Sequence, residues 1–168
     1  MKKLFAIMIA LATSVSAFSQ KNDVVDIAIS SADHTTLVAA VKAADLVATL
    51  KSAGPFTVFA PTNAAFAKLP AGTVESLLKP ENKAQLAKIL TYHVVSGNLD
   101  AAAVVAAIKE GKGKVVLTTV SGGKLTASMD SGKVKLTDES GNSAFVTATD
   151  LKGNNGVIHV IDEVVLPK

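Results

Sequence analysis

Three histidines are the residues of this chain best suited to acid–base or metal chemistry, because an imidazole titrates near neutral pH and ligates metal ions. His34 lies in a polar connection, where we expect it to be solvated, whereas His93 and His159 lie within apolar stretches. A histidine in such a stretch is more often held by a core hydrogen bond than used as a ligand. No H-x-E or H-E-x-x-H pattern and no cysteine accompanies them, so the sequence predicts neither a metal site nor a cofactor.

Two pairs of adjacent acids, Asp138-Glu139 and Asp162-Glu163, could in principle supply a general acid and a general base. Neighbouring side chains in a strand point to opposite faces, however, so this spacing does not indicate the facing carboxylates of a glycosidase. The sequence has no G-x-S-x-G nucleophile motif, and Gly111 and Gly113 form an isolated pair instead of a nucleotide-binding loop. The sequence therefore predicts a protein that is not an enzyme.

The charged and apolar residues narrow the range of partners. All 17 basic residues are lysines, so the chain lacks the guanidinium fork that recognises phosphate and guanine. Without Lys2 and Lys3, 15 lysines face 14 acids, which leaves a net charge of about +1. Hydrophobic residues make up 49% of the chain and are mainly Ala and Val. These features predict a core of small side chains and no nucleic-acid partner.

The start of the chain has the composition of a secretory signal peptide. Two lysines follow the first methionine, residues 4–12 are apolar, and residues 15–17 (VSA) form a small-residue cleavage pattern. The apolar run is too short to span a bilayer, which takes roughly 20 residues. We therefore expect residues 1–19 to be removed. Residues 20–168 would then form one secreted domain, periplasmic or extracellular, without stable insertion in a membrane.

Two stretches with clear strand patterns position these residues. In residues 54–70 a two-residue period places Phe56 and Phe59 on opposite faces, which is typical of a central strand. Pro61 ends this strand because it has no N–H to donate. Residues 156–167 form another strand with apolar groups on both faces, which we expect to lie centrally, beside the first.

Short helices are predicted around the first of these strands. Thr62 or Asn63 can cap the N–H groups of a helix that contains Phe66 and stops before Pro70. Asp100 is placed to cap a later, alanine-rich helix.

The remaining chain divides into helices first and strands second. Residues 22–54 read as two or three short helices, and Leu86, Ile89, Leu90 and His93 share one face of a later helix. From Lys114 onward the period changes to two, which predicts strands at residues 115–120, 124–129, 133–138, 144–150 and 157–161. This order predicts an α+β domain with a β-meander in its second half.

The chain resembles a bacterial fasciclin-type domain. The resemblance covers residues 22–168 through four pieces in the order of the family, namely Asp26-Ile27, residues 54–70, residues 90–95 (LTYHVV) and residues 156–167. It implies a compact β-wedge or β-sandwich with short helices packed at one side. It also implies a role in extracellular adhesion or matrix binding, here with a single copy of the domain.

The resemblance also implies which residues matter. In animal relatives a Tyr-His stretch and an acidic stretch are linked to integrin binding, and the matching residues here are Tyr92, His93, Asp162 and Glu163. The residues themselves allow another interpretation, in which Tyr92 and His93 hold their helix end against the sheet and the two acids form a solvated turn. Residues with an implied structural role are Phe56, Phe59, Pro61, Thr62, Asn63, Phe66 and His159.

Three classes of function remain open at this point. The first is a secreted, non-catalytic adhesion or matrix-interaction module whose partner is an extracellular or cell-surface protein or glycan. The second is a periplasmic or extracellular binding protein for a small apolar ligand or a glycan, although aromatic residues that stack on sugars are few. The third is an enzyme. The sequence specifies no oligomeric state.

The signal-peptide pattern predicts that the exported protein begins at Phe18 or Gln20, after a peptidase has removed the leader. N-terminal sequencing of protein recovered from outside the cytoplasm measures this directly. Exported material that still begins with Met1 would contradict the expectation.

Overall fold

The structure is a computed structural model that describes residues 22–168, so the expected signal peptide lies outside the described residues. The helices are α1 Val24–Ser30, η1 Ala32–His34, α2 Thr35–Ala43, α3 Val47–Leu50, α4 Asn63–Ala67, α5 Thr73–Leu77, η2 Pro80–Asn82, α6 Lys83–Tyr92 and α7 Ala101–Glu110. The strands are β1 Phe56–Pro61, β2 Val94–Ser96, β3 Lys114–Thr118, β4 Lys124–Asp130, β5 Lys133–Thr137, β6 Ser143–Gly153 and β7 Gly156–Ile161.

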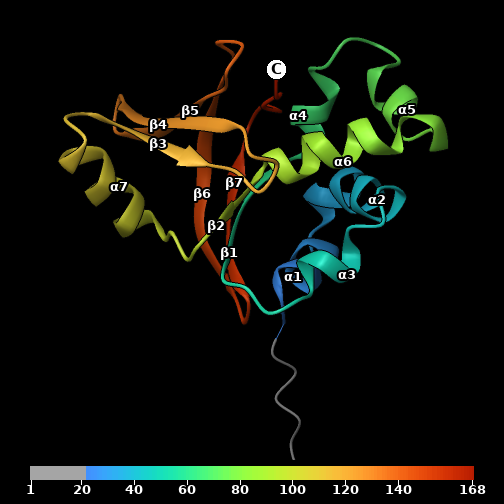
Figure 1. Ribbon diagram of the computed structural model, residues 1–168, viewed down its shortest axis with the longest axis horizontal. Helices are drawn as coiled ribbons and strands as arrows, with labels where there is room; N and C mark the ends of the chain where they lie inside the picture. The colour runs from blue at the N-terminus through green and yellow to red at the C-terminus, as the bar shows by residue number, and fades with distance from the viewer. Residues whose placement is uncertain (1–21) are drawn as a thin grey trace, which may run out of the picture.

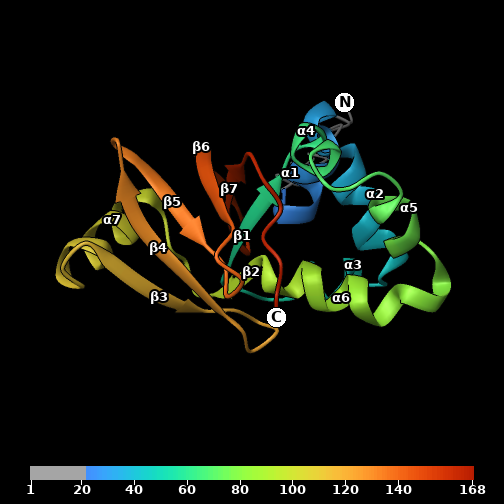
Figure 2. The same ribbon diagram turned by 90° about the horizontal axis from the view of Figure 1, so that it is seen from above.

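The strands form one seven-stranded sheet with helices on two sides. Helices α1–α6 gather on one side of the sheet, and α7 lies beyond the opposite side, near β3 and β4 (Figures 1 and 2). The described helices all precede β3, and β3 to β7 follow one another as an antiparallel meander. The predicted α+β class and meander are therefore confirmed.

The two strands that the sequence places at the centre are adjacent. The sheet order is β2-β1-β7-β6-β5-β4-β3, and β1 pairs with β7 in parallel from Phe56 opposite Gly156 to Pro61 opposite Ile161. Both strands are buried along nearly their whole length. A strand with neighbours on both edges and a core on both faces carries apolar residues on both faces, which explains the mainly apolar pattern of both strands; Thr57 and His159 are their buried polar residues.

A short strand that the sequence analysis did not predict closes the sheet. Strand β2 pairs with β1, and Val95 forms an isolated bridge with Thr119 just past the end of β3. The N–H of Val120 donates to the carbonyl of Val94 over 2.7 Å. The two edges of the sheet therefore meet at this end, and the sheet becomes a nearly closed wedge.

Each face of the central strands borders a different hydrophobic core. Val58 of β1 and Ile158 of β7 face a core shared with the helices α1–α6. Phe59 and Ile161 face a second core inside the wedge, which α7 also covers. The central strands thus form the wall between the helical half and the wedge.

The turn after β1 joins the strand to the helical half. Thr62 caps α4, since its side chain accepts a hydrogen bond from the N–H of Ala65. Asn63, the other candidate cap, instead reaches the first turn of α2, where its Oδ1 accepts from the N–H of Thr36 over 2.9 Å. Its Nδ2 donates to the carbonyl of Ala32. Asn63 therefore supplies the cap that α2 lacks from its own sequence.

No single helix within residues 22–168 has the length and hydropathy to cross a membrane. Helix α1 and the segment Ala32–Ala43 have this length and hydropathy only when they are taken together. The two helices are bent by 103° at the break between them.

Asn155, in the turn between β6 and β7, ties the helical half to the sheet. Its Oδ1 accepts from the N–H of Val24 at the start of α1 over 3.0 Å. Its Nδ2 donates to the carbonyls of Leu50, the last residue of α3, and of Ser52, over 2.7 and 3.0 Å. One amide side chain therefore satisfies three backbone groups from two separate segments.

We predict that Asn155→Ala lowers the free energy of unfolding by about 1 to 3 kcal/mol, because it leaves these half-buried backbone groups without their partner. Urea unfolding followed by far-UV circular dichroism measures the change. Asn154→Ala is the matched control, since that exposed side chain lies next in the chain and should change stability by less than about 0.5 kcal/mol. Equal stability of the two variants would contradict the assigned role of Asn155.

Candidate functional site

Tyr92 ends α6 and is fully buried at the junction with the wedge. Its hydroxyl donates to the carbonyl of Lys124 over 2.6 Å and accepts from the N–H of Glu139 over 3.3 Å. The ring packs on Gly123, where a Cβ atom would lie only 2.7 Å from Tyr92 Cε2. Burial raises the pKa of the phenol. Tyr92 thus fastens α6 to the turns at the end of the meander.

His93 follows directly and is also buried. Its Nδ1 lies 2.8 Å from the carbonyl of Ile89, and its Nε2 accepts from the N–H of Val165 over 3.3 Å. A carbonyl only accepts and an N–H only donates, so the proton of the neutral ring must sit on Nδ1. Burial lowers the pKa of His93 to about 4, against the opposing effects of the Ile89 hydrogen bond and the Asp138 charge. The ring is therefore neutral at physiological pH.

His159 is buried on the wedge side of β7, with its ring stacked on Phe59 at a centroid distance of 5.7 Å. Its Nε2 lies 2.7 Å from the carbonyl of Leu99, and its Nδ1 accepts from the N–H of Asp150 over 3.4 Å. Both nitrogens of His159 therefore have backbone partners, as do both nitrogens of His93.

The expectation that His34 is solvated is wrong. Its side chain is 4% exposed, because η1 packs against α1, α2 and α4. Its Nδ1 lies 2.7 Å from Ser31 Oγ, and burial lowers the pKa of the ring. The polar sequence around His34 hides this burial, which depends on how the neighbouring helices α1 and α2 fold back on η1 and on α4, which is distant in the chain.

The two acidic residues of the predicted partner site differ in their surroundings. Asp162 extends the pairing of β7 with β6, since its Oδ1 accepts from the N–H of Phe145 over 2.7 Å and its own N–H donates back to the Phe145 carbonyl. Glu163 is exposed and lies 3.3 Å from Lys68 Nζ. Both carboxylates are at the rim where β7 ends.

The structure brings the Tyr-His stretch and the acidic stretch close together through the backbone. The segment after β7 runs back past the end of α6, where His93 binds the N–H of Val165. The side chains of Tyr92 and His93 point into the protein, whereas Glu163 points outward. A role of these residues in binding a partner stays a prediction.

Asp138 is a structural anchor that the sequence analysis treated only as half of an acid pair. Its carboxylate is nearly buried and accepts from the N–H groups of Ser140, Asn142 and Leu166 and from the Asn142 side chain, over 2.8 to 3.0 Å. The sequence Asp138-Glu-Ser-Gly-Asn142 is typical of a turn held by an aspartate, and this was the available signal. The bond to Leu166 depends on the fold and has no local signal.

Within residues 22–168 no three His, Asp or Glu side chains converge as ligands of a metal ion.

We predict that His93 makes stability depend on pH. The unfolded ring takes up a proton near pH 6.5 and the folded ring only near pH 4, so between these values acid favours the unfolded state. The free energy of unfolding should fall by an amount on the order of 3 kcal/mol as the pH drops through this range. In His93→Gln this part of the pH dependence should disappear. Urea unfolding at pH 7 and pH 4 measures both proteins, and equal losses in both would contradict the prediction.

Comparison with known proteins places this structure in a family. The family model of the fasciclin domain matches residues 32–167. Protein sll1483 of Synechocystis sp. is 53% identical over 154 residues, which are 92% of this chain and 78% of that protein. The immunogenic protein MPB70 of Mycobacterium bovis is 39% identical over 138 residues, which are 79% of this chain and 63% of that protein.

Among solved structures, the FAS1 domain pair from the insect cell adhesion molecule fasciclin I has the same fold. The TM-score is 0.75 at 20% identity, and the match covers 86% of this chain and 51% of the other. Because the fasciclin model matches most of the chain and the fold agrees with this solved structure, the chain belongs to the fasciclin domain family.

Proposed function

We propose that this protein is an exported, non-catalytic module that binds a protein or a glycan at a cell surface or in an extracellular matrix. Its relation to the fasciclin domain supports the proposal, since the solved structure with this fold comes from a cell adhesion molecule. The leader predicted at residues 1–19 supports the exported location.

The observation that carries the proposal is the use to which the buried polar side chains are put. Backbone groups occupy the hydrogen-bonding atoms of His93, His159 and Asp138. These hydrogen bonds hold one element of the fold to another. A catalytic acid or base must instead reach a proton of the substrate. These three residues therefore act as structural clamps, and interaction with a partner takes place on the exposed surface.

The rim at the end of β7 is the surface we assign to the partner. Glu163 and Lys68 have side chains about half exposed, at 47% and 52%, and their ion pair spans 3.3 Å. An exposed pair of this kind contributes little to stability, so a partner with a basic group can replace Lys68 at small cost. Asp162 lies next to it with a backbone-anchored carboxylate. A single domain offers one such rim, and firm attachment then requires many copies on a surface.

Beads coated with the purified protein should attach to cells that export it or to the matrix around them. Asp162→Asn combined with Glu163→Gln should reduce attachment about two- to fivefold at low salt and less at physiological salt, because rim charges act through a screened field. Attachment counts at both salt concentrations, with a melting curve for each variant, measure this.

Lys68→Gln is the matched control, since it breaks the same ion pair and leaves both acids in place. Unchanged attachment by the folded double variant would remove the two acids from the partner site. Failure of the wild-type beads to attach to any of these surfaces would overturn the proposed function itself.

A further inference from the structure

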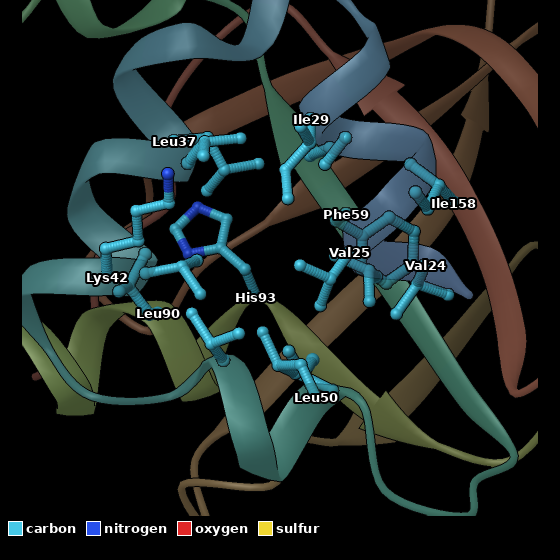
Figure 3. Close-up of a pocket in the computed structure, with 17 residues that line it drawn as sticks. Val24, Val25, Ile29, Leu37, Lys42, Leu50, Phe59, Leu90, His93 and Ile158 are labelled. Carbon is cyan, nitrogen blue, oxygen red and sulfur yellow. The ribbon is translucent and has the colours of Figure 1, made fainter. Parts of the chain in front are cut away.

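A pocket lies between the helical half and the central strands. Figure 3 shows Val24, Val25 and Ile29 of α1 at one side, and Leu37 and Lys42 of α2 at the other. Helix α3, the sheet and the end of α6 complete the lining, so the pocket is an opening into the helical core.

The lining offers almost no hydrogen bonds to a ligand. His93 contributes only its ring, because Ile89 and Val165 occupy both of its nitrogens. The other residues of the lining are aliphatic apart from Phe59 and Lys42. A molecule bound here must therefore bury an apolar body, since an unpaired polar group in such surroundings is costly.

Lys42 is the one charged residue in this lining, and it is exposed. Its aliphatic stem runs along the pocket and carries the ammonium group at its end (Figure 3). The ion pairs found among residues 22–168 do not include Lys42. The ammonium is thus available to an anionic group at the mouth, while the stem covers apolar surface.

The pocket in this conformation measures about 40 Å³, whereas a cavity of roughly 150 Å³ holds a benzene ring. A ligand therefore has to widen it, and the geometry points to α1 as the wall that moves. The first residues of α1 are held by Asn155 and by the ion pairs of Lys51 with Asp23 and Asp26. Near its other end, Ile29 is 51% exposed and covers the pocket from outside.

We propose that this pocket binds a straight-chain aliphatic carboxylate, with the chain between α1, α2 and the sheet and the carboxylate at Lys42. A methylene chain is flexible, so it can follow the apolar lining between α1, α2 and the sheet as the pocket widens. The carboxylate head can pair with the ammonium group of Lys42, the one charged side chain of the lining. This binding is independent of the rim at Asp162 and Glu163, and therefore of the proposed adhesion function.

Isothermal titration with sodium octanoate, sodium decanoate and decanol tests the proposal. Decanoate should bind with a stoichiometry of one and about tenfold more tightly than octanoate, because two more methylene groups are buried. Decanol should bind about three- to fivefold more weakly than decanoate, since it lacks the charge that pairs with Lys42. Absence of saturable decanoate binding would overturn the proposal.

Two variants test the location of the site. Lys42→Met should bind decanoate and decanol equally well, whereas Lys79→Met, which changes an exposed lysine outside the pocket, should retain the preference for decanoate. Ala28→Phe places a ring in the lining at a half-buried position and should weaken decanoate at least tenfold while circular dichroism stays native. Unchanged decanoate binding by both Lys42→Met and a folded Ala28→Phe would place the ligand elsewhere and overturn the assignment.

Discussion

The parallel pairing of β1 with β7 is the constraint on which the rest of the structure depends. These two strands separate the helical core from the wedge core, so each carries apolar residues on both faces, and the two must pair in one fixed register. The register starts at Phe56 opposite Gly156, where a Cβ atom on the glycine would lie 2.1 Å from the Phe56 carbonyl. A side chain at this position would force the strands apart. Helices α1–α6 therefore pack on one face of the β1–β7 pair, and the rest of the wedge encloses the core on the other face.

The segment after β7 is fixed by two polar side chains that belong to different halves of the protein. His93, at the end of α6, accepts from the N–H of Val165, and Asp138, at the end of β5, accepts from the N–H of Leu166. Val165 itself is buried in the wedge core. The consecutive N–H groups of Val165 and Leu166 thus bind this segment to both the helical half and the meander. This role explains why His93 and Asp138 are polar residues in an otherwise aliphatic interior.

Sequence reasoning recovered what local patterns determine. The central position of β1 and β7 follows from their apolar faces, and the caps at Thr62 and Asp100 follow from residue type and place. Three features escaped it because they depend on contacts distant in the chain. Strand β2 is too short to show a period, and the burial of His34 depends in part on α4, which only the fold brings to it. Asp138 looked like a strand end, and its bond to Leu166 joins residues 28 positions apart.

The place of β7 in the sheet has a consequence for the order in which the chain can fold. β7 lies next to β1 at the centre of the sheet, yet it follows the other strands in the chain, and the residues that bind His93 and Asp138 follow β7. Until β7 has been synthesised, β1 lacks one of its two neighbours and both cores lack a wall, so the long-range pairing of β1 with β7 must wait. A nascent chain of this order therefore keeps both cores open until β7 and the residues after it have been made.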